Sequence, residues 1–198
     1  SYDQIYDEHV FMFSAKSVNY ISKLHNLELI DVERQVTHGG SMRYIIASSG
    51  SKKISSNVGK ILEEEKNKGM NSLKRYVEFK NQCELSKKKL VQTLQTLSEE
   101  KKRVVGYGAT SKSTTILNYC NIDSSLIEFI TDTSPLKINK FSPGMHIPIR
   151  DYESFVNKYP DYAILFAWNH KREIFEKETT YINSGGKWIN FVPRISIE

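Results

Sequence analysis

From residue 103 to the end of the chain, short apolar segments alternate with segments that have helical spacing. The apolar segments are rich in β-branched and aromatic residues, which is typical of buried strands. Strands that alternate with helices of this length form a mostly parallel sheet with helices on both faces. We therefore predict a doubly wound α/β fold over residues 102–198. The expected strands are 103–108, 126–132, 162–168 and 187–192, and the expected helices are 110–120, 151–158 and 171–183.

A glycine turn joins the first of these strands to its helix, with the sequence Gly106-Tyr107-Gly108-Ala109-Thr110-Ser111-Lys112. In Rossmann-like folds, glycines at this turn let the backbone approach a pyrophosphate, and the helix N-terminus offers free N–H groups. Lys112 adds a cation, and Asp132 ends the next strand, where such folds place a ribose-binding acid. Ser111 stands where the third glycine of the dinucleotide fingerprint is expected. A structural turn without a ligand is therefore the alternative interpretation.

Residues 1–48 predict a smaller α/β piece. A helix over 14–26 begins at Ser14, and two strands, 27–33 and 42–47, flank a turn at His38-Gly39-Gly40. This piece is too small to fold alone, so we interpret it as the end of a larger α/β domain. Residues 49–101 then predict a linker followed by one long helix, or two helices with a break near Lys68-Gly69.

The net charge of +5 is concentrated in one segment. Residues 52–103 hold 14 of the 28 Lys and Arg residues and 7 of the 23 Asp and Glu residues, so this segment carries +7 and the remainder −2. Because few aromatic residues interleave with these cations, a solvated helix face is favoured over a nucleic-acid surface. A structural assembly domain that uses the basic helix is a further interpretation, and it rests on charge alone.

The two cysteines and the hydropathy pattern point to the cytoplasm. Cys83 and Cys120 lie far apart and have no metal-ligand spacing, so we expect two reduced thiols and no metal site. No apolar run approaches the ~20 residues that cross a bilayer, and no signal peptide is recognisable. We therefore expect no membrane partner and no nucleic-acid partner.

A group of reactive side chains stands near the start of the chain, where Tyr6, Glu8 and His9 precede the aromatic run Phe11-Met12-Phe13. Histidine titrates near neutrality, so a positioned histidine can take a proton from a substrate. A neighbouring carboxylate can hold the ring, and a tyrosine hydroxyl can donate to a developing oxyanion. These side chains fit the removal of a proton next to a carbonyl group.

Two more segments are expected at the carboxyl edge of the sheet, where ligands collect in parallel α/β folds. One is the loop Pro143-Gly144-Met145-His146-Ile147-Pro148, and the other is Trp168-Asn169-His170. Asn169 could bind a base or a hydroxyl, and Trp168 could stack on a base. The alternatives are a rigid proline loop with a hydrogen-bonded His146, and a tryptophan that belongs to the core.

Five motifs follow one another along the chain: Tyr6-Asp7-Glu8-His9, Thr37-His38-Gly39-Gly40-Ser41-Met42-Arg43, the Gly106–Lys112 turn, Asp132-Thr133-Ser134-Pro135-Leu136-Lys137 and Pro143-Gly144-Met145-His146-Ile147-Pro148. Taken together, they resemble the nucleotide-sugar 3-C-methyltransferases, which place a methyl branch on carbon 3 of a keto-hexose in deoxysugar biosynthesis. The resemblance covers nearly the whole chain, although Met42 and Met145 stand where the family more often has Leu and Thr. Family members have a zinc-binding N-terminal domain, a middle domain that binds S-adenosylmethionine and a Rossmann-like C-terminal domain.

The resemblance implies roles for the domains and for individual residues. Residues 1–48 would end a class I methyltransferase domain, 49–101 would be the linker and long helices, and 102–198 would be the C-terminal domain. His9 would take the proton alpha to the 4-keto group, with Tyr6 and Glu8 positioning the sugar and the base. The enolate would then attack the methyl group of S-adenosylmethionine. The residues expected to bind the nucleotide-sugar are His38, Ser41, Arg43, Gly108, Ala109, Lys112, Asp132, Lys137, Pro143, His146, Ile147 and Asn169.

The sequence lacks two features of the family. It has no Cys-x-x-Cys knuckle, so zinc is expected only in the N-terminal domain. It also has no acidic-glycine loop, so the S-adenosylmethionine pocket is expected to be incomplete and the chain alone to be inactive. The competing interpretation is a stand-alone nucleotide-sugar or NAD-binding module of an oxidoreductase or epimerase. The missing third glycine counts against NAD.

Overall fold

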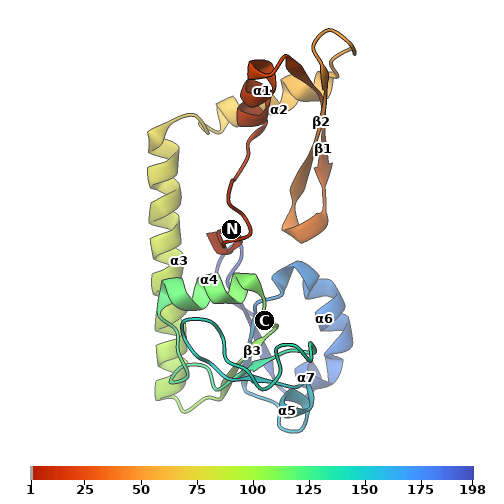
Figure 1. Cartoon of the computed structure of the whole chain (residues 1–198). Helices are drawn as coiled ribbons and strands as arrows, with labels where there is room; N and C mark the ends of the chain where they lie inside the picture. The colour runs from red at the N-terminus through yellow and green to blue at the C-terminus, as the bar shows by residue number, and fades with distance from the viewer. Residues whose placement is uncertain (1) are drawn as a thin grey trace. The chain divides into compact units, whose positions relative to one another are not determined.

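The computed structural model describes residues 2–198, which form two compact units. The larger unit contains residues 2–9 and 82–198, and the smaller unit contains residues 10–81. Figure 1 labels the α-helices and some of the strands of the two units. The smaller unit thus begins immediately after His9, and the candidate residues Tyr6, Glu8 and His9 belong to the larger unit.

The larger unit is built on a six-stranded sheet with the order β5-β4-β3-β6-β7-β8. The pairs β3–β4, β3–β6, β4–β5 and β6–β7 are parallel, and β8 is antiparallel to β7. The predicted mostly parallel, Rossmann-like α/β fold is therefore confirmed. The strands are β3 (Val104–Tyr107), β4 (Ile130–Thr131), β5 (Ile149–Arg150), β6 (Tyr162–Leu165), β7 (Lys187–Asn190) and β8 (Ser196–Ile197).

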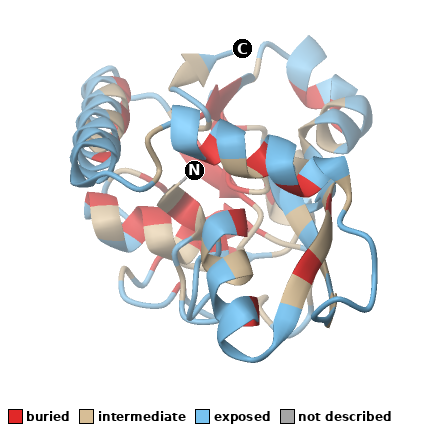
Figure 2. Ribbon diagram, turned by 90° about the horizontal axis from the view of Figure 1, so that it is seen from above, coloured by how far each residue is buried: buried red, intermediate tan, exposed pale blue. Residues whose placement is uncertain are grey.

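Helices cover both faces of this sheet, because alternate residues of each strand point to opposite sides. On one face Val104 packs with Leu90 and Leu94 of α3 (Leu73–Glu99) and with α4 (Ser111–Cys120). On the other face Val105 packs with α5 (Glu153–Val156) and α7 (Thr179–Asn183), and α6 (Lys171–Lys177) adds partly buried side chains. Figure 1 shows α3 on one side of this unit and α5, α6 and α7 on the other, and Figure 2 shows that the buried residues concentrate in the sheet.

Several element boundaries differ from the sequence predictions. The strand predicted at 126–132 begins only at Ile130, because the N–H groups of Leu126 and Ile127 both donate to the carbonyl of Asp123 in a turn. The predicted strand 162–168 ends at Leu165, and Trp168–His170 form a 3-10 turn, η3. The predicted helix 151–158 shortens to α5. The predicted helix 171–183 divides at Glu178, whose buried side chain accepts hydrogen bonds from Tyr107 and Tyr152.

The smaller unit contains α1 (Ala15–Leu24), β1 (Leu27–Gln35), a short turn η2 (Thr37–Gly39), β2 (Ser41–Ser48) and α2 (Ser56–Asn67). Ser14 caps α1 in a capping box with Ser17, and the buried Glu65 accepts from the first two N–H groups of the helix. β1 and β2 form an antiparallel pair. The predicted break near Gly69, which has a φ of +67°, separates α2 from α3. Among the helices of residues 2–198, none combines the length and the apolar character that crossing a membrane requires.

Candidate functional site

The glycine turn after β3 is shaped by close packing against the end of β6. A Cβ atom on Gly106 would lie 2.6 Å from the ring of Phe166, so only glycine fits there without a shift of the sheet. Gly108 has a φ of +90°, a conformation that L side chains rarely adopt, and a Cβ there would lie 3.0 Å from Ala167 Cβ. The two glycines therefore bring the carboxyl ends of β3 and β6 together.

Asp132 closes this turn. One carboxylate oxygen accepts from the Ala109 N–H at 2.8 Å, and the other accepts from the Ser134 N–H at 2.8 Å. Lys137 Nζ donates to the Ala109 carbonyl at 2.8 Å and lies 3.4 Å from the Asp132 carboxylate. The structure thus brings together three predicted residues, Ala109, Asp132 and Lys137. It also engages the N–H of Ala109, which a dinucleotide-binding turn would offer to a phosphate.

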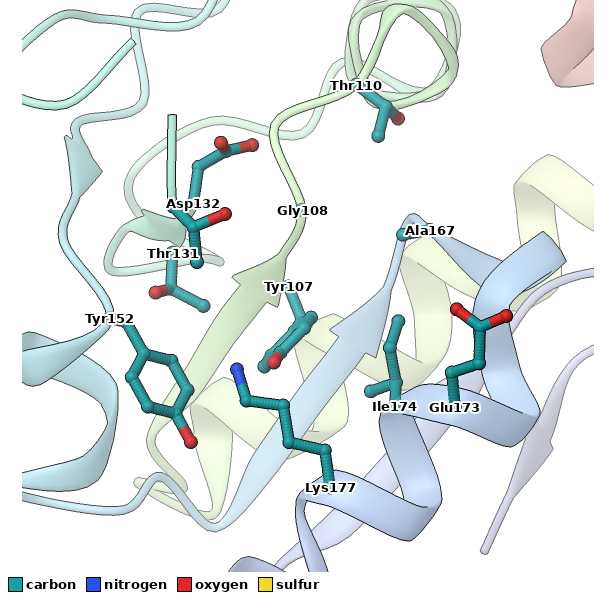
Figure 3. Close-up of a pocket in the computed structure, with 11 residues that line it drawn as sticks. Tyr107, Gly108, Thr110, Thr131, Asp132, Tyr152, Ala167, Glu173, Ile174 and Lys177 are labelled. Carbon is teal, nitrogen blue, oxygen red and sulfur yellow. The ribbon is translucent and has the colours of Figure 1, made fainter. Parts of the chain in front are cut away.

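A cavity of about 330 Å³ opens at the carboxyl ends of β3, β4 and β6, and we call it the acid-lined pocket. Its lining includes Gly108, Asp132, Tyr152, Glu173 and Lys177. Figure 3 shows the amine of Lys177 between the rings of Tyr107 and Tyr152, with Asp132 on the opposite side. The walls therefore combine two carboxylates, hydroxyls, two phenol rings and one amine, which suits a group rich in hydroxyls.

The buried carboxylate of Glu178 supports the floor of the acid-lined pocket. It accepts from Tyr107 Oη at 2.6 Å and from Tyr152 Oη at 3.0 Å, and Lys177 Nζ lies 3.5 Å away. Burial, followed by the hydrogen bond to Glu178, raises the pKa of Tyr152 to about 12, and the same causes raise the pKa of Tyr107. Both phenols stay protonated at neutral pH and remain donors to Glu178. The cluster fixes the pocket wall.

A second cavity, of about 280 Å³, lies between the N-terminus of α4 and the loop after β4, and we call it the lysine-lined pocket. Lys137 and Lys140 line it together with the hydroxyl-bearing residues Ser111 and Thr114. Thr110 lines both pockets and caps α4 by accepting from the Ser113 N–H at 3.1 Å. Cations, hydroxyls and a helix N-terminus are the groups that bind phosphate.

Several predicted site residues lie outside both pockets. Ile147 belongs to the apolar core, where it is fully buried with Ile116 of α4. Lys112 is only 7% exposed and lies on the inner face of α4. His146 is exposed on its loop and Asn169 lies in η3, and neither lines the acid-lined pocket or the lysine-lined pocket.

The proline loop is held against α4, and of its predicted residues Pro143 reaches the lysine-lined pocket. Asn118 Nδ2 donates to the Pro143 carbonyl at 3.0 Å. A Cβ on Gly144 would lie 1.9 Å from Asn118 Oδ1. The loop therefore packs closely on the C-terminal half of α4.

The remaining predicted binding residues, His38, Ser41 and Arg43, belong to the smaller unit. His38 lies in η2 with a φ of +55°, and Ser41 begins β2. Arg43 Nη1 donates to Glu33 Oε2 at 3.0 Å across the hairpin, and both side chains are exposed. These residues lie along one turn and the strand that follows it.

His9 is held in an orientation that suits a base. Its Nδ1 lies 2.7 Å from the Gln4 carbonyl oxygen, and its ring stacks on Tyr6 with the centroids 4.1 Å apart. A carbonyl can only accept, so in the neutral ring Nδ1 carries the hydrogen and Nε2 keeps its lone pair. Burial and the charges of Glu8 and Asp3 raise the pKa of Tyr6, so its hydroxyl stays protonated. Tyr6 and His9 are thus brought together, and Glu8 is exposed beside them.

Comparison with known proteins identifies the family. A model of the C-methyltransferase C-terminal domain matches residues 36–193. The chain belongs to this family. It is also similar to the C-methyltransferase NovU of Streptomyces niveus, with 32% identity over 193 residues, which cover 97% of this chain and 46% of NovU. The chain spans about half the length of that relative.

In this C-methyltransferase C-terminal domain, sequence reasoning missed the residues that hold the segment 2–9. The indole N–H of Trp168 donates to Asp3 Oδ2 at 2.5 Å, across 165 residues of sequence. Sequence reasoning also missed the Glu178 cluster and Lys140. Short-range patterns carry no signal for such contacts, although the acidic residue at 178 inside an amphipathic helix is a visible irregularity. Among residues 2–198, no three His, Cys, Asp or Glu side chains are grouped so that they could hold a metal ion.

Proposed function

We propose that this chain is part of an S-adenosylmethionine-dependent C-methyltransferase that acts on a nucleotide-linked keto-deoxysugar. Membership of the C-methyltransferase family supports the reaction class. The observation that carries the proposal is that the candidate base His9 and the glycine-turn edge belong to one compact unit. Chain segments that are far apart in sequence thus supply a base and a phosphate-binding edge.

In this proposal His9 Nε2 removes the proton alpha to the keto group of the sugar. Its Nδ1–H bond to Gln4 keeps the ring from rotating and stabilises the charge that the ring gains. The Tyr6 hydroxyl stays protonated, so it can donate to the oxygen on which negative charge develops. Glu8, which is exposed next to His9 in the chain, stays a predicted positioning residue for the sugar and the base. The product of this step is an enolate, which is the nucleophile that a methyl donor requires.

In this proposal each of the two pockets binds the part of the nucleotide-sugar whose charge suits its lining. The lysine-lined pocket, with Lys137 and Lys140 at the N-terminus of α4, suits the diphosphate. The acid-lined pocket suits a neutral part with hydroxyl groups, since its two carboxylates, Asp132 and Glu173, outnumber its one cation, Lys177. In this assignment Gly108 and Ala109 lie between the two parts of the ligand. His38, Ser41, Arg43, Lys112, His146, Ile147 and Asn169 stay predicted substrate-binding residues.

S-adenosylmethionine would supply an electrophilic methyl group. The described residues do not by themselves fit a pocket for it, because residues 10–48 form one helix and a two-stranded hairpin. In our proposal this hairpin ends a methyltransferase domain, residues 49–101 connect it, and residues 102–198 are the C-terminal domain. Exposed apolar side chains on the helix and the hairpin, such as Leu24 and Ile46, support that assignment. The lack of activity of this chain alone, a zinc site elsewhere, a cytoplasmic location and the absence of nucleic-acid and membrane partners stay predictions.

An NAD-binding module is the second candidate. The strand order β5-β4-β3-β6-β7, followed by an antiparallel β8, corresponds to the order of dinucleotide-binding folds. Against it stands the Asp132 carboxylate, which already engages the Ala109 N–H at the turn. A pyrophosphate at that point would have to displace a negative charge.

Isothermal titration calorimetry of this chain tests the proposed function. We expect binding of dTDP or UDP and no binding of S-adenosylmethionine. Binding of NAD should be at least about tenfold weaker than binding of the nucleoside diphosphate, a difference of about 1.4 kcal/mol in binding free energy. The matched control is Lys158→Ala, which removes an exposed lysine that lines neither pocket. Tighter binding of NAD than of either nucleoside diphosphate would support the second candidate. Micromolar binding of S-adenosylmethionine would contradict the domain assignment.

A further inference from the structure

Residues 2–9 are held to the rest of the larger unit by contacts with η3, α4 and α3. Asp3 is fully buried, and its carboxylate accepts from the indole N–H of Trp168 in η3 at 2.5 Å. Thr115 Oγ1 of α4 donates to the Ile5 carbonyl at 3.1 Å. Tyr2 packs edge-on against Tyr119 of α4 with the ring centroids 5.3 Å apart. Figure 1 shows the N-terminal end of the chain beside α4.

Tyr2 completes this attachment on α3. Its hydroxyl lies 3.4 Å from Ser86 Oγ, and burial raises its pKa far above the usual value for a tyrosine. The side chain therefore stays a neutral phenol between the helices. The segment has no regular secondary structure apart from the 3-10 turn η1 (Tyr2–Gln4), so side-chain contacts determine its position.

The attachment leads directly to the ring of His9. Asp3 precedes Gln4, and the Gln4 carbonyl is the group that the His9 Nδ1–H contacts at 2.7 Å. The N–H of His9 also donates to the Tyr6 carbonyl at 2.9 Å, so the chain turns back on itself here. A displacement of η1 would move the Gln4 carbonyl away from Nδ1 and release the ring.

We propose that Asp3 and Trp168 are positioning residues that fix the tautomer and the direction of the His9 ring from the carboxyl end of β6. This inference rests on the proposed role of His9 as the base. Trp168 follows β6, whose end packs against the glycine turn through Ala167. The same sheet edge that holds the proposed nucleotide site therefore also holds the base. A buried hydrogen bond from an indole N–H to a carboxyl oxygen suits this task, because it is short and directional.

The test is nitrogen NMR of the imidazole rings at a pH where the rings are neutral, with His9→Gln used to assign the signal. In the unaltered chain we expect the Nδ1–H form of His9 to dominate. Trp168→Phe keeps an aromatic ring but removes the N–H donor, and we expect the Nε2–H form to rise several-fold. Asp3→Asn keeps the size and weakens the acceptor, so it should give a smaller change in the same direction.

Trp188→Phe is the matched control. The indole N–H of Trp188 is buried and has no hydrogen-bond partner among the described residues, so its loss removes no hydrogen bond. It should leave the His9 signal unchanged although it also shortens a buried side chain. An unchanged tautomer in folded Trp168→Phe, or an equal change in both tryptophan variants, overturns the inference.

Two further measurements distinguish a failure of the inference from a failure of the variant to fold and from a failure of the proposed function. If Trp168→Phe does not fold, the exchange of the Trp168 indole N–H with water is measured in the unaltered chain instead. Slow exchange with water supports the inference, and exchange as fast as in a free indole overturns it. In the product of the intact gene, Trp168→Phe should lower kcat for methyl transfer with little change in KM for the nucleotide-sugar. An absence of methyl transfer in the unsubstituted gene product would instead contradict the proposed function and leave the NMR result standing.

Discussion

Residues 2–9 and the glycine turn after β3 both carry candidate site residues, but the molecule holds them in different ways. The turn is fixed by backbone hydrogen bonds of a parallel sheet, by Asp132 and by close packing at Gly106 and Gly108. The segment 2–9 is fixed by a few side-chain contacts to α3, α4 and Trp168. The comparison teaches that the candidate binding edge belongs to the sheet itself, whereas the candidate base is placed by contacts that one substitution can remove.

The largest effect is expected at His9. In the product of the intact gene, His9→Ala should lower the rate of methyl transfer by roughly 100-fold or more, because a positioned general base contributes about that much. Binding of the nucleoside diphosphate, measured by calorimetry, should stay within about twofold, since His9 lines neither pocket. Unchanged turnover in a folded variant would exclude His9 as the base. The segment 2–9 would then differ from the glycine turn only in how it is held.

The rigidity of the turn is tested at Gly106. Gly106→Ala places a methyl group 2.6 Å from the Phe166 ring, so we expect a loss of about 1–3 kcal/mol in the free energy of unfolding. The matched control is Gly59→Ala in α2, where a Cβ meets no atom within 4 Å and alanine should stabilise the helix by about 0.5–1 kcal/mol. Denaturant unfolding measures both. If the change in the free energy of unfolding were as small for Gly106→Ala as for Gly59→Ala, the turn would be shown to tolerate movement.

Much of the fold of the larger unit could be predicted, because buried parallel strands give apolar runs and amphipathic helices give their own period. The two-residue strands β5 and β8 were missed, since so short a strand has no pattern. Glu178 divides the last predicted helix because its carboxylate is buried with Tyr107 and Tyr152, which local propensity does not reveal.

The candidate site was less predictable than the fold. The burial of Lys112 was visible in principle, because it lies four and eight residues before Ile116 and Cys120, on the same face of α4. Ile147 is an apolar residue in a loop, and tertiary packing places it in the core. The contact between Asp3 and Trp168 could not be predicted, because no local pattern relates residues so far apart in sequence.

The charge division between the two pockets gives a moderate effect. Lys137→Ala and Lys140→Ala should each weaken binding of a nucleoside diphosphate by roughly 3- to 10-fold, with the larger loss at low salt. Lys137→Ala also removes the hydrogen bond to the Ala109 carbonyl, so Lys140→Ala is the cleaner variant. The comparison variant is Lys112→Ala, whose side chain is buried and lines neither pocket. A greater loss of affinity for Lys112→Ala than for Lys140→Ala would place the phosphates elsewhere.

The smallest effect concerns the thiol of Cys120, which reports on the attachment of residues 2–9. Burial raises the pKa of this thiol to about 11, and the Tyr2 hydroxyl contacts it. At pH 8 only about one thiol in a thousand is ionised, so labelling of the native protein should be slow. Trp168→Phe should raise the rate by about two- to fivefold, because the segment that covers Cys120 detaches more often. The measurement uses a Cys83→Ser background, since Cys83 is a second free thiol and its labelling would be counted with that of Cys120. An equal increase in Trp188→Phe would mean that the whole unit opens, and the segment 2–9 would then be as firmly held as the glycine turn.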